Sequence, residues 1–451
     1  MKKLIFSLFM ALIAVQAWAV ASVNTMFTEG DLAYRVLSTG GDDTYPSVRV
    51  IGFSATGEAK TSIQLTIPAY ATFNNETYAV KNVDPSAFKG KTSITSVRFM
   101  YGVQSIDASA FENCTNMTYA NIPSSMLFIY GKAFAGCTKL AKVYYALPDP
   151  TGRVINSDAF PSNSGMTLYV PRTNANSVQL YKKVAAFSKF STVTKSGLAC
   201  DFTMDTGERV CVTKAPTKTT NGQVTIVGLN KNATNFVDGV LKRTSTSYNV
   251  SPYKYTLVSV CDSAFVNNTD LKGVDFTGCS TLTTIGTGAF NGCTALTSVT
   301  LNSGLTTIDN EAFAKCTKLA SITLPASVKD VSFSFVDGST SLTSINVEAG
   351  SKSYASYNGL LFYSGVRDLV RCPEGKTGQL HDSSFPVTMK TVVRFAFDHC
   401  QKITQLALPY GVTVVGQYAF KNCTQMASCI IPSSVNSLST TAFIGCTGLN
   451  S

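Results

Sequence analysis

The chain has 451 residues, of which 45% are hydrophobic and 14% charged, with a formal net charge of +10 at pH 7. This positive balance is mild and contains no run of five Lys or Arg residues, so the sequence does not favour a nucleic-acid partner. A chain of this length ordinarily forms two or three domains, but an array of repeats grows in one dimension and escapes that rule.

The first 19 residues have the parts of a secretory signal peptide. Lys2 and Lys3 precede an apolar stretch over 4–15 that is too short to span a bilayer, and a small-x-small cleavage signal ends at Ala19. No Cys follows the predicted cleavage site, so no lipoprotein anchor is indicated, and no later stretch predicts a transmembrane segment in the mature chain. We therefore expect a secreted or cell-surface protein.

A Phe preceded by Ala, and once by Ser, recurs along the chain at intervals of 22 to 26 residues within each run. These residues are Phe88, Phe111, Phe134, Phe160, Phe265, Phe290, Phe313, Phe335, Phe397, Phe420 and Phe443. Other apolar residues keep phase with them. The alternation at Val299 and Leu301 predicts a short strand, and 309–314 is expected to be a helical or 3₁₀ return that inserts Phe313 into a shared core. One such coil cannot bury its own apolar face, so the coils must stack.

The repeat pattern A-F-x-x-C-x-x-L-x-x-[IV]-x-[LI]-P occurs at one phase in segments such as KAFAGCTKL, EAFAKCTKL, QYAFKNCTQM and TAFIGCTGL. It resembles the BspA-like, Treponema pallidum-type leucine-rich repeat of bacterial surface proteins. The repeats cover about half of the predicted mature chain. The expected fold is an α/β solenoid of repeats of about 23 residues with short parallel strands, flanked by β-hairpin caps.

Outside the repeats the sequence is duplicated, which predicts two tandem modules. Phe27-Thr28 and Phe202-Thr203 are followed at equal offsets of seven and nine by Tyr34 and Val36, and by Arg209 and Cys211. The predicted parts are a signal peptide (1–19), an N-terminal β cap (20–82), a first repeat module with a C-terminal cap (83–196), a second β cap (197–259), and a second module (260–451) with a hairpin insert near 350–390.

The closing segment of the first module is expected to contain one helix. Val178, Tyr181, Val184 and Phe187 recur at helical spacing before Phe190. The second module has no such segment, because the sequence stops at Ser451 within a repeat. That stop indicates either a truncated product, which the pattern favours, or an end completed by a partner.

Seven cysteines lie three residues after a repeat Phe and form a predicted structural ladder: Cys114, Cys137, Cys293, Cys316, Cys400, Cys423 and Cys446. We interpret them as buried thiols that satisfy backbone groups in a tight turn, with bridges between stacked coils as the alternative. One sulfur per coil lacks the converging set that a metal requires. A bridge between Cys200 and Cys211, across an expected turn at 205–207, stays open.

No enzyme is indicated, because the sequence has no nucleophile elbow, no phosphate loop and no metal-ligand cluster, and no cofactor is expected. A nucleophile pair of Cys400 and His399 would need an exposed thiol, whereas the repeat predicts a buried one. His399 occupies the position before a ladder cysteine, which Asn422 and Gly292 fill elsewhere and which we interpret as a tolerant surface position. Asp42-Asp43 is interpreted as a turn.

Strand residues that face outward should form the ligand surface of a solenoid. In the first module this surface is predicted to contain Arg98, Tyr119, Asn121, Lys142 and Tyr144, which are residue types enriched in binding hot spots. The second module offers only a bland surface of Ser298, Thr300, Ser321, Thr323, Gln405 and Ala407.

The resemblance implies non-catalytic adhesion or protein–protein binding, with a host or bacterial surface protein as partner and matrix or plasma proteins such as fibronectin as possible ligands. The alternative is a surface protein that binds a glycan for nutrient capture. Fold alone does not decide between them.

Overall fold

The computed structural model describes residues 20–41, 44–163, 165–171, 177–196, 199–203, 208–216, 220–229, 238–243, 247–250 and 253–450. The predicted signal peptide and the turns predicted at 42–43 and 205–207 lie outside these ranges. The chain divides into two compact units, the first formed by 1–170, 178–194 and 217–219 and the second by 171–177, 195–216 and 220–451. Each unit is described separately.

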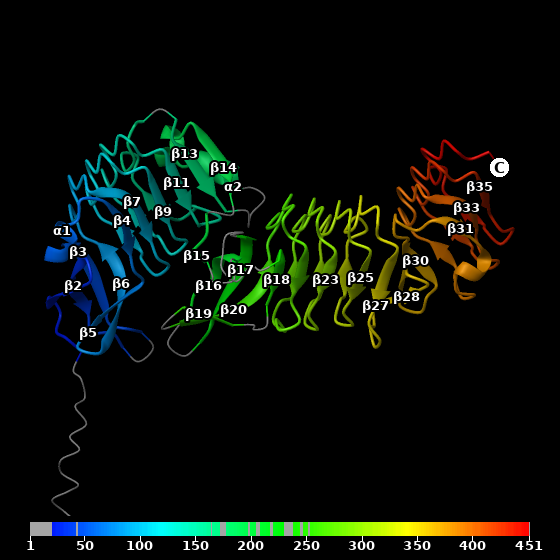
Figure 1. Cartoon of the computed structure of the whole chain (residues 1–451), viewed down its shortest axis with the longest axis horizontal. Helices are drawn as coiled ribbons and strands as arrows, with labels where there is room; N and C mark the ends of the chain where they lie inside the picture. The colour runs from blue at the N-terminus through cyan, green and yellow to red at the C-terminus, as the bar shows by residue number, and fades with distance from the viewer. Residues whose placement is uncertain are drawn as a thin grey trace, which may run out of the picture. The chain divides into compact units, whose positions relative to one another are not determined.

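The first unit begins with antiparallel strands that continue into parallel coils (Figure 1). The strands of this eight-stranded sheet are β1 (Met26–Glu29), β2 (Leu32–Ser38), β3 (Ser47–Phe53), β5 (Tyr70–Phe73), β6 (Glu76–Val83), β8 (Ser105–Ile106), β10 (Phe128–Ile129) and β12 (Val154–Ile155). Their order is β1-β2-β3-β6-β8-β10-β12, with β5 paired antiparallel to β6. Because β6 also pairs in parallel with β3 and β8, the starting strands cover the first coil directly.

A six-stranded sheet forms the other face of the first unit. Its strands are β4 (Ile63–Ile67), β7 (Ile94–Phe99), β9 (Tyr119–Ile122), β11 (Lys142–Tyr145), β13 (Thr167–Val170) and β14 (Thr192–Lys195), in the order β14-β13-β11-β9-β7-β4. The pairs from β4 to β13 are parallel and nearly in register. Within β11, Val143 and Tyr145 are buried whereas Lys142 is exposed, which is the alternation that a half-buried strand requires.

The closing segment of the first unit is not the single helix predicted from the sequence. It consists of α2 (Ser177–Lys182), the 3₁₀ helix η1 (Ala185–Lys189) and β14. Val184 has an extended backbone (φ −90°, ψ 121°) and interrupts the helix. The interruption lets Tyr181 and Phe187 both enter the core, where the hydroxyl of Tyr181 donates to the carbonyl of Leu147 at 2.6 Å.

The second unit starts with the same strand order as the first. Its starting strands are β15 (Phe202–Thr203), β16 (Glu208–Lys214), β17 (Gly222–Leu229), β19 (Ser247–Val250) and β20 (Tyr253–Val260). As in the first unit, the first three strands, β15, β16 and β17, pair antiparallel with one another in sequence order. Strand β20 then pairs in parallel with β17, and β19 pairs antiparallel with β20. The register differs by one residue from the sequence alignment. Phe27 lies opposite Tyr34, but Phe202 lies opposite Val210 and not Arg209.

The coils of the second unit contribute strands to several sheets. The starting sheet continues through β22 (Thr284–Ile285), β24 (Thr307–Ile308) and β26 (Asp330–Val331). The remaining strands are β18 (Val240–Lys242), β21 (Gly273–Asp275), β23 (Ser298–Thr300), β25 (Ser321–Leu324), β27 (Ser344–Val347), β28 (Tyr354–Tyr357), β29 (Leu360–Tyr363), β30 (Asp368–Arg371), β31 (Gly378–Leu380), β32 (Thr391–Val392), β33 (Ile403–Ala407), β34 (Val414–Val415), β35 (Ser428–Ile430) and β36 (Ser437–Leu438). Their sheets have the orders β18-β21-β23, β25-β27, β28-β29-β30-β32-β34-β36 and β31-β33-β35.

The region of the predicted hairpin insert contains two consecutive hairpins. Strand β29 pairs antiparallel with both β28 and β30, and β30 then pairs in parallel with β32. Asn358 and Gly359 join β28 to β29 with φ values of +51° and +76°, as a two-residue hairpin turn requires. The insert therefore rejoins the stack of coils through β30.

The fold is a leucine-rich-repeat β-solenoid with parallel strands and few helices, so the α/β part of the sequence prediction differs from the structure. Besides α2 and η1, the described helices are α1 (Ala55–Glu58) and the 3₁₀ helix η2 (Asp382–Ser384). The return segment over 309–314, expected to be helical or 3₁₀, is not a helix: the structure has a run of turns over 310–315. No helix in the described part of the chain is long and apolar enough to cross a bilayer.

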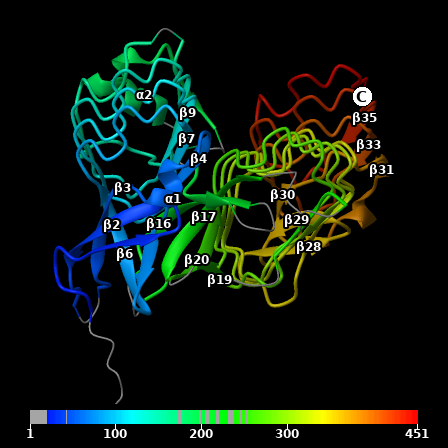
Figure 2. The ribbon, with the colours of Figure 1, turned by 60° about the vertical axis from the view of Figure 1, so that its left-hand side comes forward.

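The repeat phenylalanines form stacks along the interior of each unit. Ring centroids lie 5.1 Å apart for Phe88 and Phe111 and 5.4 Å apart for Phe111 and Phe134. In the second unit Phe290 lies 4.8 Å from Phe265 and 5.0 Å from Phe313, with interplanar angles of 7° and 1°. These rings are buried (Figure 2 views the coils of the second unit close to end-on). The regular spacing of Phe in the sequence thus corresponds to a continuous core.

Candidate binding surface

The predicted ligand residues of the first unit lie on adjacent strands of the six-stranded sheet. Strand register places Arg98 beside Asn121 and Tyr119 beside Lys142. Tyr144 lies beside Asn121 on one side and Tyr169 on the other. Arg98 on β7, Tyr119 and Asn121 on β9, and Lys142 and Tyr144 on β11 therefore share one face, because alternate residues of a strand point the same way.

Three tyrosines form an aromatic row across this face. The rings of Tyr119 and Tyr144 meet edge to face with centroids 6.4 Å apart, and those of Tyr144 and Tyr169 stack at 4.7 Å. Tyr119 and Lys142 are exposed, whereas Tyr144 and Tyr169 are half-buried. We name Arg98, Tyr119, Asn121, Lys142, Tyr144 and Tyr169 the tyrosine face. Sequence reasoning missed Tyr169 because it lies in the closing strand, outside the repeat phase, although its alternation with Leu168 and Val170 was a usable signal.

The corresponding face of the second unit is short and chemically plain. Ser298 and Thr300 lie on β23, Ser321 and Thr323 on β25, and Gln405 and Ala407 on β33. Strands β23 and β25 fall in different sheets, so this surface is also interrupted. Small hydroxyl side chains bury little area, so such a face is a weaker anchor for a partner than the tyrosine face.

Each ladder cysteine donates its thiol to a backbone carbonyl of the preceding coil. Sulfur-to-oxygen distances are 3.1 Å from Cys114 to Phe88, 3.1 Å from Cys137 to Phe111, 3.1 Å from Cys293 to Phe265, 3.3 Å from Cys316 to Phe290, 3.1 Å from Cys423 to Phe397 and 2.9 Å from Cys446 to Phe420. Cys400 donates instead to Cys372, at 3.5 Å. These bonds link successive coils and occupy carbonyls that lie inside the turn.

Ser339 shows that the ladder position needs a donor. Its hydroxyl donates to the carbonyl of Phe313 at 2.8 Å and accepts from the backbone N–H of Cys316 at 3.0 Å. Ser339 is fully buried. It follows Phe313 by 26 residues, which is the separation between Cys114 and Phe88, so it takes the place of a ladder cysteine.

All thirteen cysteines are free thiols in the structure. Cys200 and Cys211, for which a bridge was left open, are both buried, and the Cys211 sulfur donates to the carbonyl of Ala199 at 3.6 Å. Burial raises the pKa of Cys293 to about 12. The side-chain interaction with Cys423 lowers the pKa of the half-buried Cys446 to about 7, against the opposing effect of burial. Among the described residues, no three His, Cys, Asp or Glu side chains converge as metal ligands.

The position before each ladder cysteine is not the tolerant surface site that the sequence suggested. His399, Asn422 and Gly445 all have a positive φ there, between +57° and +78°. A Cβ added to Gly445 would overlap the side-chain oxygen of Asn422 in the preceding coil, and one added to Gly136 would overlap that of Asn113. Glycine leaves the asparagine side chain of the preceding coil in place, whereas any other residue there would require that side chain to move.

The thiol of Cys400 is fully buried, whereas the side chain of His399 is 43% exposed. His399 Nδ1 lies 2.8 Å from an Asp398 oxygen, and its Nε2 lies 2.9 Å from the side-chain nitrogen of Asn422. The ring is thus engaged by Asp398 and Asn422, while the Cys400 thiol points to the Cys372 carbonyl. This arrangement does not form a nucleophile–base pair.

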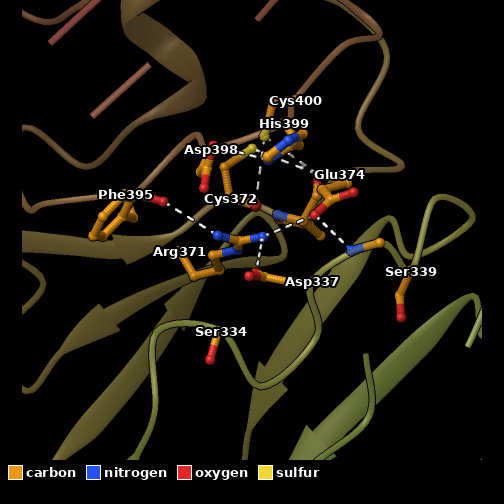
Figure 3. A network of polar contacts seen from close by, with 12 residues as sticks. Ser334, Asp337, Ser339, Arg371, Cys372, Glu374, Phe395, Asp398, His399 and Cys400 are labelled. Carbon is orange, nitrogen blue, oxygen red and sulfur yellow. Dashed lines mark hydrogen bonds and ion pairs between the residues drawn. The ribbon is translucent and has the colours of Figure 1, made fainter. Parts of the chain in front are cut away.

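A buried polar network, which sequence reasoning did not find, joins the hairpin region to its neighbouring coils (Figure 3). The guanidinium of Arg371, whose side chain is 1% exposed, lies 2.8 Å from Asp337 and 3.0 Å from Glu374. It also donates to the carbonyl of Phe395 at 3.2 Å, and Glu374 accepts from the backbone N–H of Gly338 at 2.9 Å. Glu374 is close to Arg371 in the sequence, but Asp337 precedes Arg371 by 34 residues and Phe395 follows it by 24. No local sequence motif therefore indicates the network.

Burial and charge act in opposite directions in this network. Burial raises the pKa of Glu374 above its ordinary value of 4.5, while the Gly338 N–H and the Arg371 charge oppose that rise. Burial likewise raises the pKa of Asp337, and Arg371 again opposes it. Burial disfavours the charge of Arg371, but the facing carboxylates, Asp337 foremost, hold its pKa above the ordinary value. A buried guanidinium between two carboxylates fixes three coils to one another.

Comparisons with known proteins agree with the repeat pattern. The model of the BspA type leucine rich repeat region matches in six copies over residues 71–189, 243–361 and 375–451. No curated protein gives a match. A leucine rich cell surface protein from Faecalibacterium prausnitzii A2-165 has 17% identity and a TM-score of 0.34, covering 95% of this chain and 88% of that one.

Two further solved structures are similar at the same low level. A leucine-rich repeat protein from Bacteroides ovatus ATCC 8483 has 17% identity and a TM-score of 0.37, with 94% of this chain and 93% of that chain covered. The T. pallidum leucine rich repeat protein has 21% identity and a TM-score of 0.29, with 53% and 88% covered. Family membership therefore rests on the repeat model, which matches more than half of the sequence. The chain belongs to the BspA-type leucine-rich-repeat family.

Proposed function

We propose that this protein is exported and binds another protein, a host or bacterial surface protein, through the tyrosine face of its first unit, without catalysing a reaction. Leucine-rich-repeat proteins of this kind bind other proteins. The observation that carries the proposal is the aromatic row of Tyr119, Tyr144 and Tyr169 beside Lys142. Tyrosine and basic side chains on a rigid sheet supply contact area at a low cost in conformational entropy.

The rigidity of the tyrosine face supports this role. Each residue lies on a strand paired on both sides, and the inward-facing Val97, Ala120 and Val143 of these strands belong to the same core cluster as the stacked phenylalanines. Tyr144 is further held by ring contacts with Tyr119 and Tyr169. A preformed surface loses little freedom when a partner docks, so more of the contact energy remains as affinity.

Export is part of the same proposal. The signal-peptide pattern over 1–19 and membership in a family of surface or secreted proteins support it. Mass spectrometry of the secreted product tests it directly: we expect the mature N-terminus at Val20. An intact N-terminus in a cytosolic fraction would contradict export.

The binding test uses purified extracellular-matrix and plasma proteins, with fibronectin among them, immobilised for surface plasmon resonance. We expect saturable binding by the protein and a loss of at least about 2 kcal/mol of binding energy, roughly 30-fold in Kd, when Tyr119 and Tyr144 are both replaced by Ala. The matched control replaces Ser321 and Thr323 by Ala on the corresponding face of the second unit and should bind like the unmodified protein. Equal binding by all three proteins would exclude the tyrosine face.

A further inference from the structure

A cavity of about 340 Å³ lies in the second unit where the hairpin region meets the neighbouring coils. It is lined by the charged residues Asp337, Arg371, Arg394, Asp398 and Lys421 and by Asn310, Ser332, Phe333, Ser334 and Phe395. The lining residues come from separate coils that the stack brings together. We name it the hairpin pocket.

Two cations, Arg394 and Lys421, line the pocket without an ion pair to a carboxylate among the described residues, although the charge of Lys421 acts on Asp337 from a greater distance. Arg394 is exposed, and its guanidinium carbon lies 5.0 Å from the ring centroid of Phe395 and 5.9 Å from that of Phe333. The ammonium of Lys421 lies 5.8 Å from the same Phe395 ring. Among the residues that the structure describes, neither cation forms an ion pair. Two positive groups are therefore held on one aromatic ring with their hydrogen-bond donors available to a ligand.

The acidic groups of the pocket are, in contrast, already engaged. Asp337 forms an ion pair with the buried guanidinium of Arg371, and Asp398 faces the imidazole of His399, although the Oδ1 atoms of both aspartates have no hydrogen-bond partner among the described residues. Arg371 also lines the pocket, and its Nε is a buried donor without a hydrogen-bond partner.

Phe395 is a fixed support for both cations. Its ring stacks on Tyr418 with centroids 5.2 Å apart, and its backbone has a φ of +60°. The carbonyl of Phe395 accepts from Arg371 at 3.2 Å, which ties this unusual backbone conformation to the buried network. The pocket is thus built on a rigid floor rather than on a free loop.

The size and chemistry of the pocket define the class of ligand. A volume of about 340 Å³ exceeds what a lone inorganic anion fills and suits one small organic ring. Neutral hydrogen-bonding groups at Asn310, Ser332 and Ser334 match hydroxyl groups, and the planar guanidinium of Arg394 matches a carboxylate in a bidentate arrangement.

We propose that the hairpin pocket binds an acidic sugar residue, a pyranose with a carboxylate, whose carboxylate is received by Arg394 and Lys421 and whose hydroxyl groups are received by the Asn310 and Ser side of the pocket. This site is on the second unit and is separate from the tyrosine face. The chain would then recognise a uronic-acid-containing glycan in addition to a protein partner.

Titration of the purified protein with glucuronate, followed by saturation-transfer NMR and calorimetry, tests the proposal, with glucose as the neutral counterpart. We expect saturable binding of glucuronate, at least tenfold weaker binding of glucose, and a loss of affinity as salt is added, because salt screens the ion pairs. Replacing Arg394 or Lys421 by Met should weaken glucuronate binding at least tenfold. R394K keeps the charge but loses the bidentate guanidinium, so its glucuronate affinity should lie between that of R394M and that of the original protein.

The matched controls are R367M and K329M, which remove an exposed cation elsewhere in the second unit and should leave glucuronate binding unchanged. Circular-dichroism melting confirms that each variant is folded. The proposal is overturned if glucuronate does not bind, if R394M and K421M behave like the controls, or if inorganic sulfate binds as tightly as glucuronate, which would indicate a simple oxyanion site. The variant with Tyr119 and Tyr144 replaced should bind glucuronate normally, so failure of one site is distinguishable from failure of the other.

Discussion

The thiol of Cys137 donates a hydrogen bond to the backbone carbonyl of Phe111, one coil earlier, with sulfur and oxygen 3.1 Å apart. The same relationship recurs at Cys114, Cys293, Cys316, Cys423 and Cys446. What these positions share is a hydrogen-bond donor and not a sulfur atom, since Ser339 makes the equivalent bond through its hydroxyl. The ladder cysteines therefore have a structural role that does not require oxidation.

We predict that Cys137→Ala destabilises the protein more than Cys137→Ser. Alanine leaves the buried carbonyl of Phe111 without its donor, at a cost of about 1–3 kcal/mol, whereas serine keeps the donor. Urea denaturation followed by circular dichroism measures the difference. Equal losses in the two variants would show that the thiol contributes only its volume.

The second prediction concerns how much the phenylalanine stack contributes to the stability of the fold. Phe290 lies between Phe265 and Phe313, so Phe290→Ala removes a fully buried ring and should cost about 3–5 kcal/mol. Phe290→Leu keeps most of the apolar contact but loses two ring contacts and should cost less. Tyr410→Ala, at a residue that is 80% exposed, is the control and should change stability by less than about 0.5 kcal/mol. If Phe290→Ala resembled this control in thermal unfolding, the stack would not support the core.

Glu374 predicts a pH dependence of stability. Its folded pKa is raised by burial, so the folded protein holds the proton more tightly than the unfolded chain does. The free energy of unfolding should therefore fall as pH rises from 4.5 through the folded pKa, because charging the buried group penalises the folded state. Glu374→Gln removes this contribution, and its stability should fall less over the same interval.

The measurement is chemical denaturation of both proteins at a series of pH values between about 4 and 8, where a carboxyl with a raised pKa titrates. Asp337→Asn should act in the same direction, since burial also raises the pKa of Asp337. A Glu374→Gln variant whose stability falls with pH as steeply as that of the original protein would contradict the prediction.

Cys446 should be the most reactive of the ladder thiols near neutral pH. It is half-buried and has a pKa of about 7, whereas Cys293 is fully buried with a pKa of about 12. The thiolate is the reactive form, so the lowered pKa and the partial exposure of Cys446 both favour its reaction near neutral pH. Brief alkylation with iodoacetamide and peptide mass spectrometry should modify Cys446 first. Modification of Cys293 at the same rate would refute the difference in environment.

The core was predictable from the sequence because its period is a local property of the chain. A Phe every 22 to 26 residues, with Cys three residues later, already requires stacked coils. The face containing Tyr119, Lys142 and Tyr144 followed from strand alternation. Tyr169 did not, because it belongs to the closing strand and joins the face only through pairing between β11 and β13.

Features that depend on contacts between distant residues were not predictable in this way. In the sequence, Arg371 has no feature that distinguishes it from other strand residues. Its role depends on Asp337 and the Phe395 carbonyl, which only the stacking of the coils brings beside it. The predictions of a helical return and of a single closing helix were wrong because contacts with the core, and not local helical spacing, determine the backbone there. Turns can place the return Phe in the core without a helix, and an extended Val184 lets Tyr181 and Phe187 both reach the interior.

The pairing of Asn113 with Gly136 limits how this array can evolve. The asparagine oxygen fills the space that a side chain would need one coil later, and Asn267 with Gly292 and Asn422 with Gly445 repeat the contact. Unequal recombination that inserted one asparagine-bearing coil directly after another would bring a Cβ against that oxygen. Gains and losses that preserve the asparagine-then-glycine succession avoid moving the asparagine side chain, which favours duplication of two adjacent coils together over duplication of one.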